Sequence, residues 1–171
     1  NLKFIDFGTG TGCLLLSALN EFPNSSGVGV DISRECIKLA KENAALNGLS
    51  QRARFIESDW GREVTDKFDI IIANPPYIQS DTISTLDPEV KNFDPHIALD
   101  GGQDGLSCYR KLAPQFVGIL KKGGLIFLEI GYNQSESVSN IMEHSGLKCL
   151  HINQDLGHRD RCLVLAHRHQ Y

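Results

Sequence analysis

The sequence lacks paired cysteines, long apolar runs and an excess of basic residues. Its five cysteines are scattered and contain no C-x-x-C pair, so neither a structural zinc site nor a disulfide framework is expected. We predict free, mostly buried thiols in a reducing cytoplasm and no bound metal. No apolar run approaches the roughly 20 residues of a membrane helix, which argues against a membrane protein. The formal net charge is −4, whereas proteins that bind duplex DNA mainly through phosphates usually carry a basic excess.

The composition that is present indicates one ordinary globular domain. The chain has 171 residues, of which 41% are hydrophobic and 22% are charged, and this length is sufficient to bury a core. It opens on Asn1 with no initiator methionine, signal peptide or leading helix. We therefore expect a chain that begins inside a structural element, as though cut from a longer protein.

Segments of strand and helix character alternate along the chain. Strands are predicted at 3–7, 27–31, 53–57, 68–73, 125–130, 148–152 and 162–167. Helices are predicted at 13–19, from the N-cap Ser33 to about 47, at 106–120 with a kink or a break at Pro114, and at 135–144. This alternation indicates an α/β fold, a seven-stranded, mostly parallel, Rossmann-like sheet covered on both faces. The polar turn at 154–160 predicts that the last two strands form a terminal antiparallel hairpin.

The first candidate ligand loop follows the first predicted strand, because ligands of open α/β sheets bind beyond the carboxyl ends of the strands. It reads Asp6-Phe7-Gly8-Thr9-Gly10-Thr11-Gly12, and its glycines allow a sharp turn and a close approach to a ligand. The third glycine comes one residue too early for the dinucleotide pattern G-x-G-x-x-G/A, and Cys13 stands where that pattern needs Gly or Ala. The loop therefore favours a nucleoside ligand without phosphates; a tight turn without a ligand is the alternative.

Two further strand ends offer carboxylates. Asp31 closes the second predicted strand, where it would accept hydrogen bonds from both hydroxyls of a ribose or cap the helix ahead of Ser33. Asp59 and Trp60 follow the third strand, where they would line an adenine ring or form a surface loop with a packed tryptophan. Together with the glycine loop, these residues predict a nucleoside site.

The most specific feature is Asn74-Pro75-Pro76-Tyr77, which follows the fourth predicted strand. Residues before proline are driven into extended conformations, so Asn74 and Pro75 are both held out of the helical region. The Asn74 amide oxygen and the Pro75 carbonyl then form a rigid pair of acceptors that suits a planar –NH2 group, and Tyr77 offers that group a flat face. A proline-rich turn that only ends the strand is the alternative. The irregular segment that continues to about 103 also indicates a functional loop.

These motifs resemble those of class I S-adenosylmethionine-dependent methyltransferases, in which N-P-P-Y marks enzymes that methylate a planar or conjugated nitrogen. Over essentially its whole length the chain is similar to the release factor glutamine methyltransferase (HemK/PrmC) family. The segments that carry this similarity are Ala98 to Gly102, Asp104 to Leu106, Tyr109-Arg110, Leu128 to Gly131 with Gln134, and Asp155 to Gly157 with Asp160-Arg161. The resemblance implies a Rossmann-like methyltransferase sheet.

The resemblance also implies a role for each matching residue. Gly8, Thr9, Gly10 and Gly12 would wrap the methionine part of S-adenosylmethionine, Asp31 would hold its ribose, and Ile32, Asp59 and Trp60 would lie at its adenine. The full set of cofactor-binding residues is Asp6, Gly8, Thr9, Gly10, Thr11, Gly12, Asp31, Ile32, Asp59, Trp60 and Asn74. The catalytic residues are Asn74, Pro75 and Tyr77, and the substrate-binding residues are Asn74, Pro75, Pro76 and Tyr77.

The implied substrate is the glutamine of the Gly-Gly-Gln tripeptide of class I peptide-chain release factors, methylated on side-chain nitrogen N5 with S-adenosylhomocysteine as the second product. Because an amide nitrogen is a poor nucleophile and no strong base is recognisable near Asn74, positioning and electrostatics would carry the reaction. Residues 1–171 would form the catalytic domain of a cytoplasmic monomer without direct contact to nucleic acid. The helical substrate-binding domain that precedes it in this family is expected to be missing, with poor activity on release factor as the result.

Several rival interpretations share part of these features. The nearest is an N-P-P-Y amino-methyltransferase that acts on DNA adenine or RNA guanine; an NAD-dependent dehydrogenase and a noncatalytic cofactor-binding protein are more distant. Glu129 and Arg161 are secondary candidates at the substrate entrance, or structural groups. We interpret Gly101-Gly102-Gln103 as an incidental match to the substrate tripeptide, because the family varies at the position of Gln103.

Overall fold

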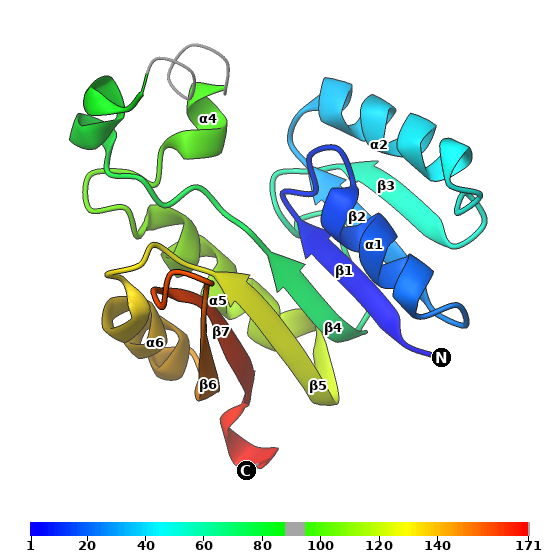
Figure 1. Cartoon of the computed structure of the whole chain (residues 1–171). Helices are drawn as coiled ribbons and strands as arrows, with labels where there is room; N and C mark the ends of the chain where they lie inside the picture. The colour runs from blue at the N-terminus through cyan, green and yellow to red at the C-terminus, as the bar shows by residue number, and fades with distance from the viewer. Residues whose placement is uncertain (88–94, 171) are drawn as a thin grey trace.

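The computed structural model describes residues 1–87 and 95–170 and consists of a central sheet with helices on both faces (Figure 1). In chain order the elements are β1 (Lys3–Phe7), α1 (Cys13–Glu21), β2 (Ser26–Asp31), α2 (Arg34–Leu46), β3 (Ala53–Glu57), β4 (Phe68–Ala73), the 3₁₀ helix η1 (Ser80–Thr85), α4 (His96–Leu99), α5 (Ser107–Ile119), β5 (Leu120–Glu129), α6 (Ser135–His144), β6 (Leu147–Gln154), β7 (Asp160–His167) and the 3₁₀ helix η2 (Arg168–Gln170).

The strands of the described chain pair in one seven-stranded sheet in the order β3-β2-β1-β4-β5-β7-β6. The five strands β3, β2, β1, β4 and β5 are parallel to one another, whereas β7 runs antiparallel to both β5 and β6. Ile5 in the middle of β1 pairs with Val28 of β2 and Ile71 of β4, so the carboxyl ends of these strands meet at one edge. The predicted α/β fold with a terminal antiparallel hairpin is confirmed.

Alternating side chains of the strands enter two separate cores, because successive residues of a strand point to opposite faces. Phe4 of β1 packs with the buried leucines of α1 and with Ile37 and Ala40 of α2. Ile5 and Phe7 join the larger core beneath α5 and α6. The parallel strands are thus covered on both faces, and their carboxyl edge remains available for loops.

The helix predicted at 106–120 is present as α5, and it continues through Pro114 from Ser107 to Ile119, so of the predicted kink or break the break is absent. A proline inside a helix removes one backbone hydrogen bond. Leu112 and Phe116, on either side of Pro114, are both completely buried, and their packing holds the two halves of the helix on the sheet.

Strand β5 begins at Leu120, five positions before the predicted start at 125. The pairing with β4 shifts between Phe68 and Ile70, where Leu120 and Leu125 are the successive partners. Gly123 has a φ of 79°, and this left-handed conformation lets the strand carry the extra residues. The sequence indicated a turn at Gly123-Gly124, but it did not indicate that Leu120, ahead of this turn, already pairs with Phe68 of β4.

The thiols are free, as predicted, but the prediction that they are mostly buried is wrong. Cys108 is buried, Cys13 is exposed, and the other three are half-buried. Cys13 is the first residue of α1, whose buried residues are Leu15, Leu16 and Leu19. In the described part of the chain no group of three or more His, Cys, Asp or Glu side chains could hold a metal ion. None of the described helices is long and apolar enough to span a membrane.

The irregular segment predicted from Asn74 to 103 contains η1 and α4 and folds back on itself; its residues 88–94 lie outside the described part. The Ile78 N–H donates to the Leu99 carbonyl at 3.1 Å, and the Gly101 N–H donates to the Ile78 carbonyl at 2.8 Å. These bonds form a short parallel bridge between Ile78 and Asp100. The segment therefore returns to the carboxyl edge of the sheet, next to the end of β4.

Candidate active site

The glycine loop after β1 is shaped by left-handed backbone conformations. Gly8, Gly10 and Gly12 have φ values of 69°, 53° and 81°. Residues other than glycine rarely adopt these values. The N–H groups of Gly8 and Thr9 both donate to the Val30 carbonyl at 2.9 Å. The sharp turn that the glycines predicted is present, and these bonds fix the loop against the end of β2.

Asp31 joins the glycine loop to the loop that follows β2. One carboxylate oxygen accepts the Gly10 N–H at 2.8 Å, and the other accepts the Ser33 N–H at 2.9 Å. The cap of α2 is Ser33 itself, whose hydroxyl accepts the Cys36 N–H at 3.2 Å. Asp31 thus aligns two loops, and the alternative in which it caps α2 does not hold.

Asp6 at the end of β1 and Thr9 in the glycine loop are joined by a buried hydrogen bond. Asp6 is 2% exposed, and its carboxylate accepts the Thr9 hydroxyl at 2.7 Å. Burial and, to a smaller extent, the charge of the neighbouring Asp31 raise the pKa of Asp6 to about 7, although the Thr9 hydrogen bond opposes the shift. This bond ties the glycine loop to the end of β1.

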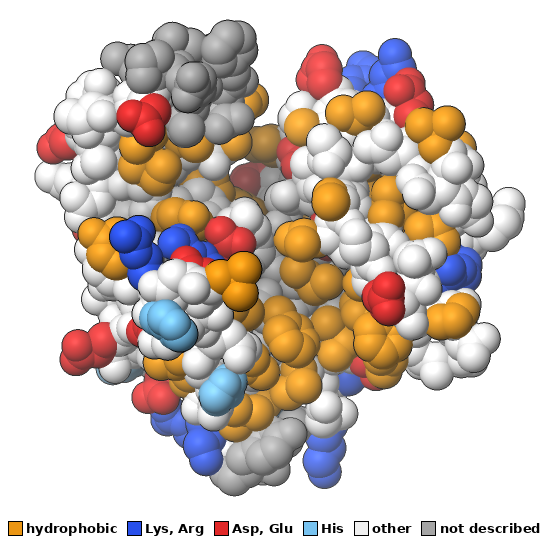
Figure 2. All heavy atoms as spheres, viewed as in Figure 1, with side chains coloured by type: hydrophobic (Ala, Val, Ile, Leu, Met, Phe, Trp, Pro, Cys, Tyr) orange, Lys and Arg blue, Asp and Glu red, His pale blue; other side chains and the backbone are white. Residues whose placement is uncertain are grey.

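A cavity of about 480 Å³ opens above these loops, and Figure 2 shows the surface hollowed between the α4 side and the α2 side of the molecule. It has the size of a small-molecule site. The predicted residues that line it are Gly8, Gly10, Asp31, Ile32, Asp59, Trp60, Asn74 and Pro76. The sheet edge therefore brings together residues from the ends of four strands.

Trp60 and Ile32 form apolar parts of the cavity wall. Trp60 has a φ of 56°, rare for a bulky residue, and its half-buried ring packs against the larger core. A Cβ placed on Gly8 would lie 3.8 Å from Trp60 Cζ3. Ile32 is exposed at the opposite loop. These side chains can contact the faces of a flat ring.

The Asn74-to-Tyr77 loop leaves the end of β4. The Asn74 side chain is exposed and lines the cavity, Pro75 is buried, and Tyr77 is half-buried behind them. Asn74 makes no side-chain hydrogen bond to another described residue, so its amide is available to a ligand. The exposed Asn74 amide can therefore exchange hydrogen bonds with a ligand in the cavity.

Comparison with known proteins decides what kind of domain this is. Residues 1–163 match the family described as "Methyltransferase domain". The chain belongs to the methyltransferase domain family. It is 45% identical over 162 residues to the release factor glutamine methyltransferase of Agrobacterium fabrum, which covers 95% of this chain and 56% of that protein. The protein of the same name from Caulobacter vibrioides is 43% identical over 163 residues, with the same coverage.

These relatives confirm the resemblance stated from the sequence motifs. The methyltransferase domain spans about half the length of the curated relatives it matches. Among solved structures it is similar to the ribosomal protein L11 methylase of Lactobacillus delbrueckii subsp. bulgaricus, with a TM-score of 0.71, 24% identity, and coverage of 98% of this chain and 71% of that one. That likeness supports the Rossmann-like fold.

A buried glutamine fixes the position of Tyr77 in the methyltransferase domain. Gln134, 8% exposed, donates through its amide nitrogen to the carbonyls of Tyr77 and Gly105 at 3.1 and 3.2 Å. Its amide oxygen accepts the Gly131 N–H at 2.9 Å and the Tyr109 hydroxyl at 3.3 Å. Both ends of the amide are satisfied, so Gln134 holds four segments in one arrangement.

Glycines at 101 and 105 allow this close packing. A Cβ on Gly105 would lie 2.5 Å from the Tyr77 carbonyl oxygen, and one on Gly101 would lie 2.8 Å from the Tyr77 Cα. Both distances are too short for a real contact. These two positions of the 98–110 segment are therefore glycine because the Tyr77 backbone passes directly against them.

The Tyr77 hydroxyl meets the two secondary candidates from the sequence. It donates to Glu129 Oε1 at 3.2 Å and accepts from an Arg161 N–H at 3.5 Å. Burial raises the pKa of Tyr77, and the Glu129 charge adds to the shift. Glu129 and Arg161 thus touch the candidate site through Tyr77, from the ends of β5 and β7.

Acidic residues of the 98–110 segment hold its own loop. Asp100 accepts the Ser80 hydroxyl at 2.7 Å and the Gly102 N–H at 2.8 Å. Asp104 accepts both arms of the Arg110 guanidinium, which lowers the pKa of its carboxyl to about 2. Asp100, Asp104 and Arg110, which match the family in this segment, therefore mainly hold the shape of their own loop.

The remaining predicted residues lie outside the cavity wall. The Thr11 carbonyl accepts the Asn43 amide at 2.9 Å and so faces α2. Gly12 contacts α2 and β3: a Cβ on it would lie 3.3 Å from atoms of Ala40, Leu16 and Phe55. Pro75 and Tyr77 follow Asn74 in the chain and do not line the cavity.

Sequence reasoning missed cavity residues contributed by later segments. They are Pro95, Ile97, Ala98, Asp100, Cys108 and Lys111, and Ser58 directly after β3 was missed as well. Asp100 had a signal in the family match, but Lys111 is an ordinary helical lysine in the sequence. Only the return of the 95–111 region to the sheet edge places it beside the cavity.

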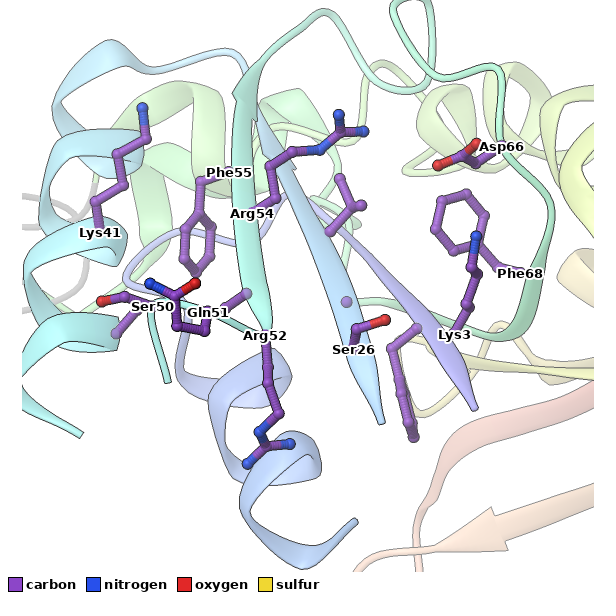
Figure 3. A pocket seen from close by; sticks show the side chains of 15 residues that line it. Lys3, Ser26, Lys41, Ser50, Gln51, Arg52, Arg54, Phe55, Asp66 and Phe68 are labelled. Atoms are coloured by element: carbon purple, nitrogen blue, oxygen red, sulfur yellow. The ribbon is translucent and has the colours of Figure 1, made fainter. Parts of the chain in front are cut away.

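A larger hollow of about 670 Å³ lies across β1, β2 and β3 on the side away from the glycine loop, and includes none of the predicted residues (Figure 3). Its wall carries Lys3, Lys41, Arg52 and Arg54. Arg52 already donates to the carbonyls of Leu19, Phe22 and Ser25. The chemistry of the candidate site is at the smaller cavity.

Proposed function

We propose that this chain transfers a methyl group from S-adenosylmethionine to the side-chain amide nitrogen N5 of the glutamine in the Gly-Gly-Gln tripeptide of class I peptide-chain release factors. The observation that carries this proposal is the exposed Asn74 amide on the wall of the cavity that Asp31 and Gly10 also line. The names and 43–45% identity of the relatives support it. In this proposal residues 1–171 act as the catalytic domain of a cytoplasmic monomer that needs no contact with nucleic acid.

The residues around the cavity fit the nucleoside part of this cofactor. A carboxylate offers about four lone-pair positions, and Asp31 uses two of them for Gly10 and Ser33. The others suit two ribose hydroxyls. Ile32 and Trp60 supply apolar contact for a flat base, while the exposed Asp59 can accept from its amino edge. S-adenosylmethionine, when bound, supplies an electrophilic methyl group.

The Asn74-to-Tyr77 loop would orient the substrate. The Asn74 amide oxygen and the Pro75 carbonyl would accept the two hydrogens of the glutamine amide. The lone pair of the nitrogen would then face the cavity. The same acceptors stabilise the positive charge that develops on nitrogen during transfer. Tyr77 packs against the amide plane, and the proton leaves to water after transfer.

Mass spectrometry of the acceptor tests the proposal. The chain is incubated with S-adenosylmethionine and equimolar release factor, adenine-containing duplex DNA and ribosomal RNA. We expect one added methyl on the tripeptide glutamine and none on either nucleic acid. Methylation of DNA adenine or RNA guanine in place of the protein would show that the N-P-P-Y loop serves a nucleic-acid amino group. Cofactor binding without any methylation would show a noncatalytic domain.

A further inference from the structure

The turn between β6 and β7 presents a leucine to water. Leu156 is 104% exposed, and the nearby Tyr132, in the loop between β5 and α6, is 59% exposed. The Arg159 guanidinium lies 5.4 Å from the centre of the Tyr132 ring, a cation–π distance. We call these three side chains the hairpin patch.

Hydrogen bonds to Asp155 make the turn rigid. Asp155 Oδ1 accepts the N–H groups of Gly157 at 2.8 Å and Arg159 at 3.1 Å. The Asp155 backbone also pairs with Arg159 and His158 at 2.9 Å. Leu156 is therefore held out on a closed turn, which reduces the entropy lost when a partner contacts it.

The same aspartate connects the hairpin patch to the candidate active site. Arg161 donates to Asp155 Oδ2 at 3.4 Å and to the Tyr77 hydroxyl at 3.5 Å. A further Arg161 bond, to the Ile130 carbonyl at 3.3 Å, anchors the end of β5 just before Tyr132. The patch and Tyr77 thus share one rigid support at the carboxyl edge of the sheet.

The hairpin patch contributes little to the fold itself. A fully exposed leucine gains no hydrophobic stabilisation, and Arg159 forms no ion pair with a carboxylate among the described residues. Three side chains are also far fewer than the 20 or so per partner that a stable dimer interface needs. The patch fits a small contact beside a substrate more closely than a contact with a second copy.

We propose that the hairpin patch docks the folded protein that carries the methyl-accepting glutamine. Leu156 enters an apolar recess of that protein beside the Gly-Gly-Gln tripeptide, and Arg159 pairs with a carboxylate at its rim. This inference rests on the proposed function and names a second contact of the same substrate. The contact fixes the approach of the glutamine to Asn74.

The test compares two exposed leucines. Leu156→Asp places a charge in the hairpin patch, and Leu46→Asp places the same charge at the end of α2, where Leu46 is 83% exposed. With whole release factor as substrate, Leu156→Asp should raise KM about tenfold and leave kcat and cofactor affinity within twofold. Leu46→Asp should change none of these quantities. Leu156→Met, which keeps an apolar side chain, should have the KM of the wild type, and Arg159→Ala should raise KM about threefold.

Other outcomes overturn the inference in distinguishable ways. Equal KM values for Leu156→Asp and Leu46→Asp would remove the docking role and leave the proposed function standing. A wild-type chain that binds cofactor and methylates no release factor would overturn the proposed function and the docking role with it. If sedimentation shows a wild-type dimer that only Leu156→Asp separates, the patch contacts a second copy instead.

Discussion

The glycine loop at residues 8–12 and the Asn74-to-Tyr77 loop leave neighbouring parallel strands at the same edge of the sheet, but they are held in different ways. The glycine loop takes its shape from its own backbone, with left-handed conformations and bonds to Val30 and Asp31 of the adjacent strand. Tyr77 is held by Gln134, Glu129 and Arg161, which come from 52 to 84 positions further along the chain.

This difference separates the two tasks expected of the site. A loop fixed by its backbone presents N–H groups and small residues to a ligand whose shape is constant. A loop fixed by side chains from several elements depends on the complete fold, and can position a reacting group to within the tolerance that catalysis requires. We therefore expect substitutions around Asn74 to change turnover, and substitutions around Asp31 to change cofactor affinity.

The largest effect is expected from Asn74→Ala. Loss of one acceptor of the developing charge should lower turnover about 100-fold, as is typical for groups that stabilise transition-state charge. Cofactor affinity, measured by calorimetry, should stay within twofold. Asn24→Ala, at the exposed turn before β2, is the control and should match the wild type. An equal collapse of cofactor affinity, with unchanged turnover per bound complex, would contradict the orienting role.

Asp31→Ala should have the opposite signature. It removes a charged acceptor from the cavity and leaves the Gly10 and Ser33 N–H groups without their partner. We expect cofactor to bind about 30-fold more weakly, since hydrogen bonds to a charged group contribute about 2 kcal/mol. At saturating cofactor, turnover should recover to within threefold. Asp66→Ala, an exposed aspartate outside this cavity, serves as control, and unchanged cofactor affinity in Asp31→Ala would refute the assignment.

Gln134→Leu tests the support of Tyr77. The substitution removes the side-chain partner of the Gly131 N–H and of the Tyr77 and Gly105 carbonyls. The Tyr109 hydroxyl loses one of its two acceptors and keeps the Glu129 carbonyl. Both stability and loop position should therefore suffer. We expect about tenfold lower turnover with cofactor affinity unchanged. Val138→Ala lies one turn further along α6, is completely buried, and should cost comparable stability, on the order of 2 kcal/mol. If it lowers turnover as much as Gln134→Leu does, the effect is general destabilisation and the positioning role fails.

The smallest effect on the reaction is expected from Asp6, which acts through the glycine loop and stability. Its folded-state pKa of about 7 lies above the usual 3.8, so the folded protein retains a proton that the unfolded chain releases. The free energy of unfolding should therefore fall as pH rises from 4 to 7, by at most about 4 kcal/mol. Asp6→Asn keeps the acceptor for Thr9 and should flatten this decrease in urea unfolding. A wild-type stability that rises over this pH range would contradict the pKa shift.

Much of the glycine-loop half could be predicted from local sequence. Gly8, Gly10 and Gly12 specify the turn directly, because only glycine adopts these φ values at little cost. Ser33 predicted the start of α2, and its hydroxyl makes the predicted cap. Interactions between residues close in sequence, or on adjacent strands of one β-α-β unit, can be predicted from the sequence pattern.

The surroundings of the Asn74-to-Tyr77 loop were harder to predict, although the motif of Asn74, Pro75 and Pro76 was recognisable in the sequence. The sequence did not show that Lys111 reaches the cavity, or that Gln134 holds the backbone of Tyr77. Each depends on packing between elements far apart in the chain, where tertiary contacts outweigh local preference.

By itself, the sequence determined the alternation of strands and helices, the turns that glycine and proline impose, and the acceptor groups at Asn74 and Pro75. These follow from dihedral preferences and from hydrophobic periodicity, which act within a few residues. The tertiary structure alone decided which carboxylates are buried, which side chains share the cavity, and how Gln134 holds Tyr77. Burial and hydrogen-bond satisfaction depend on every neighbour in space, and those neighbours come from segments that only the completed sheet brings together.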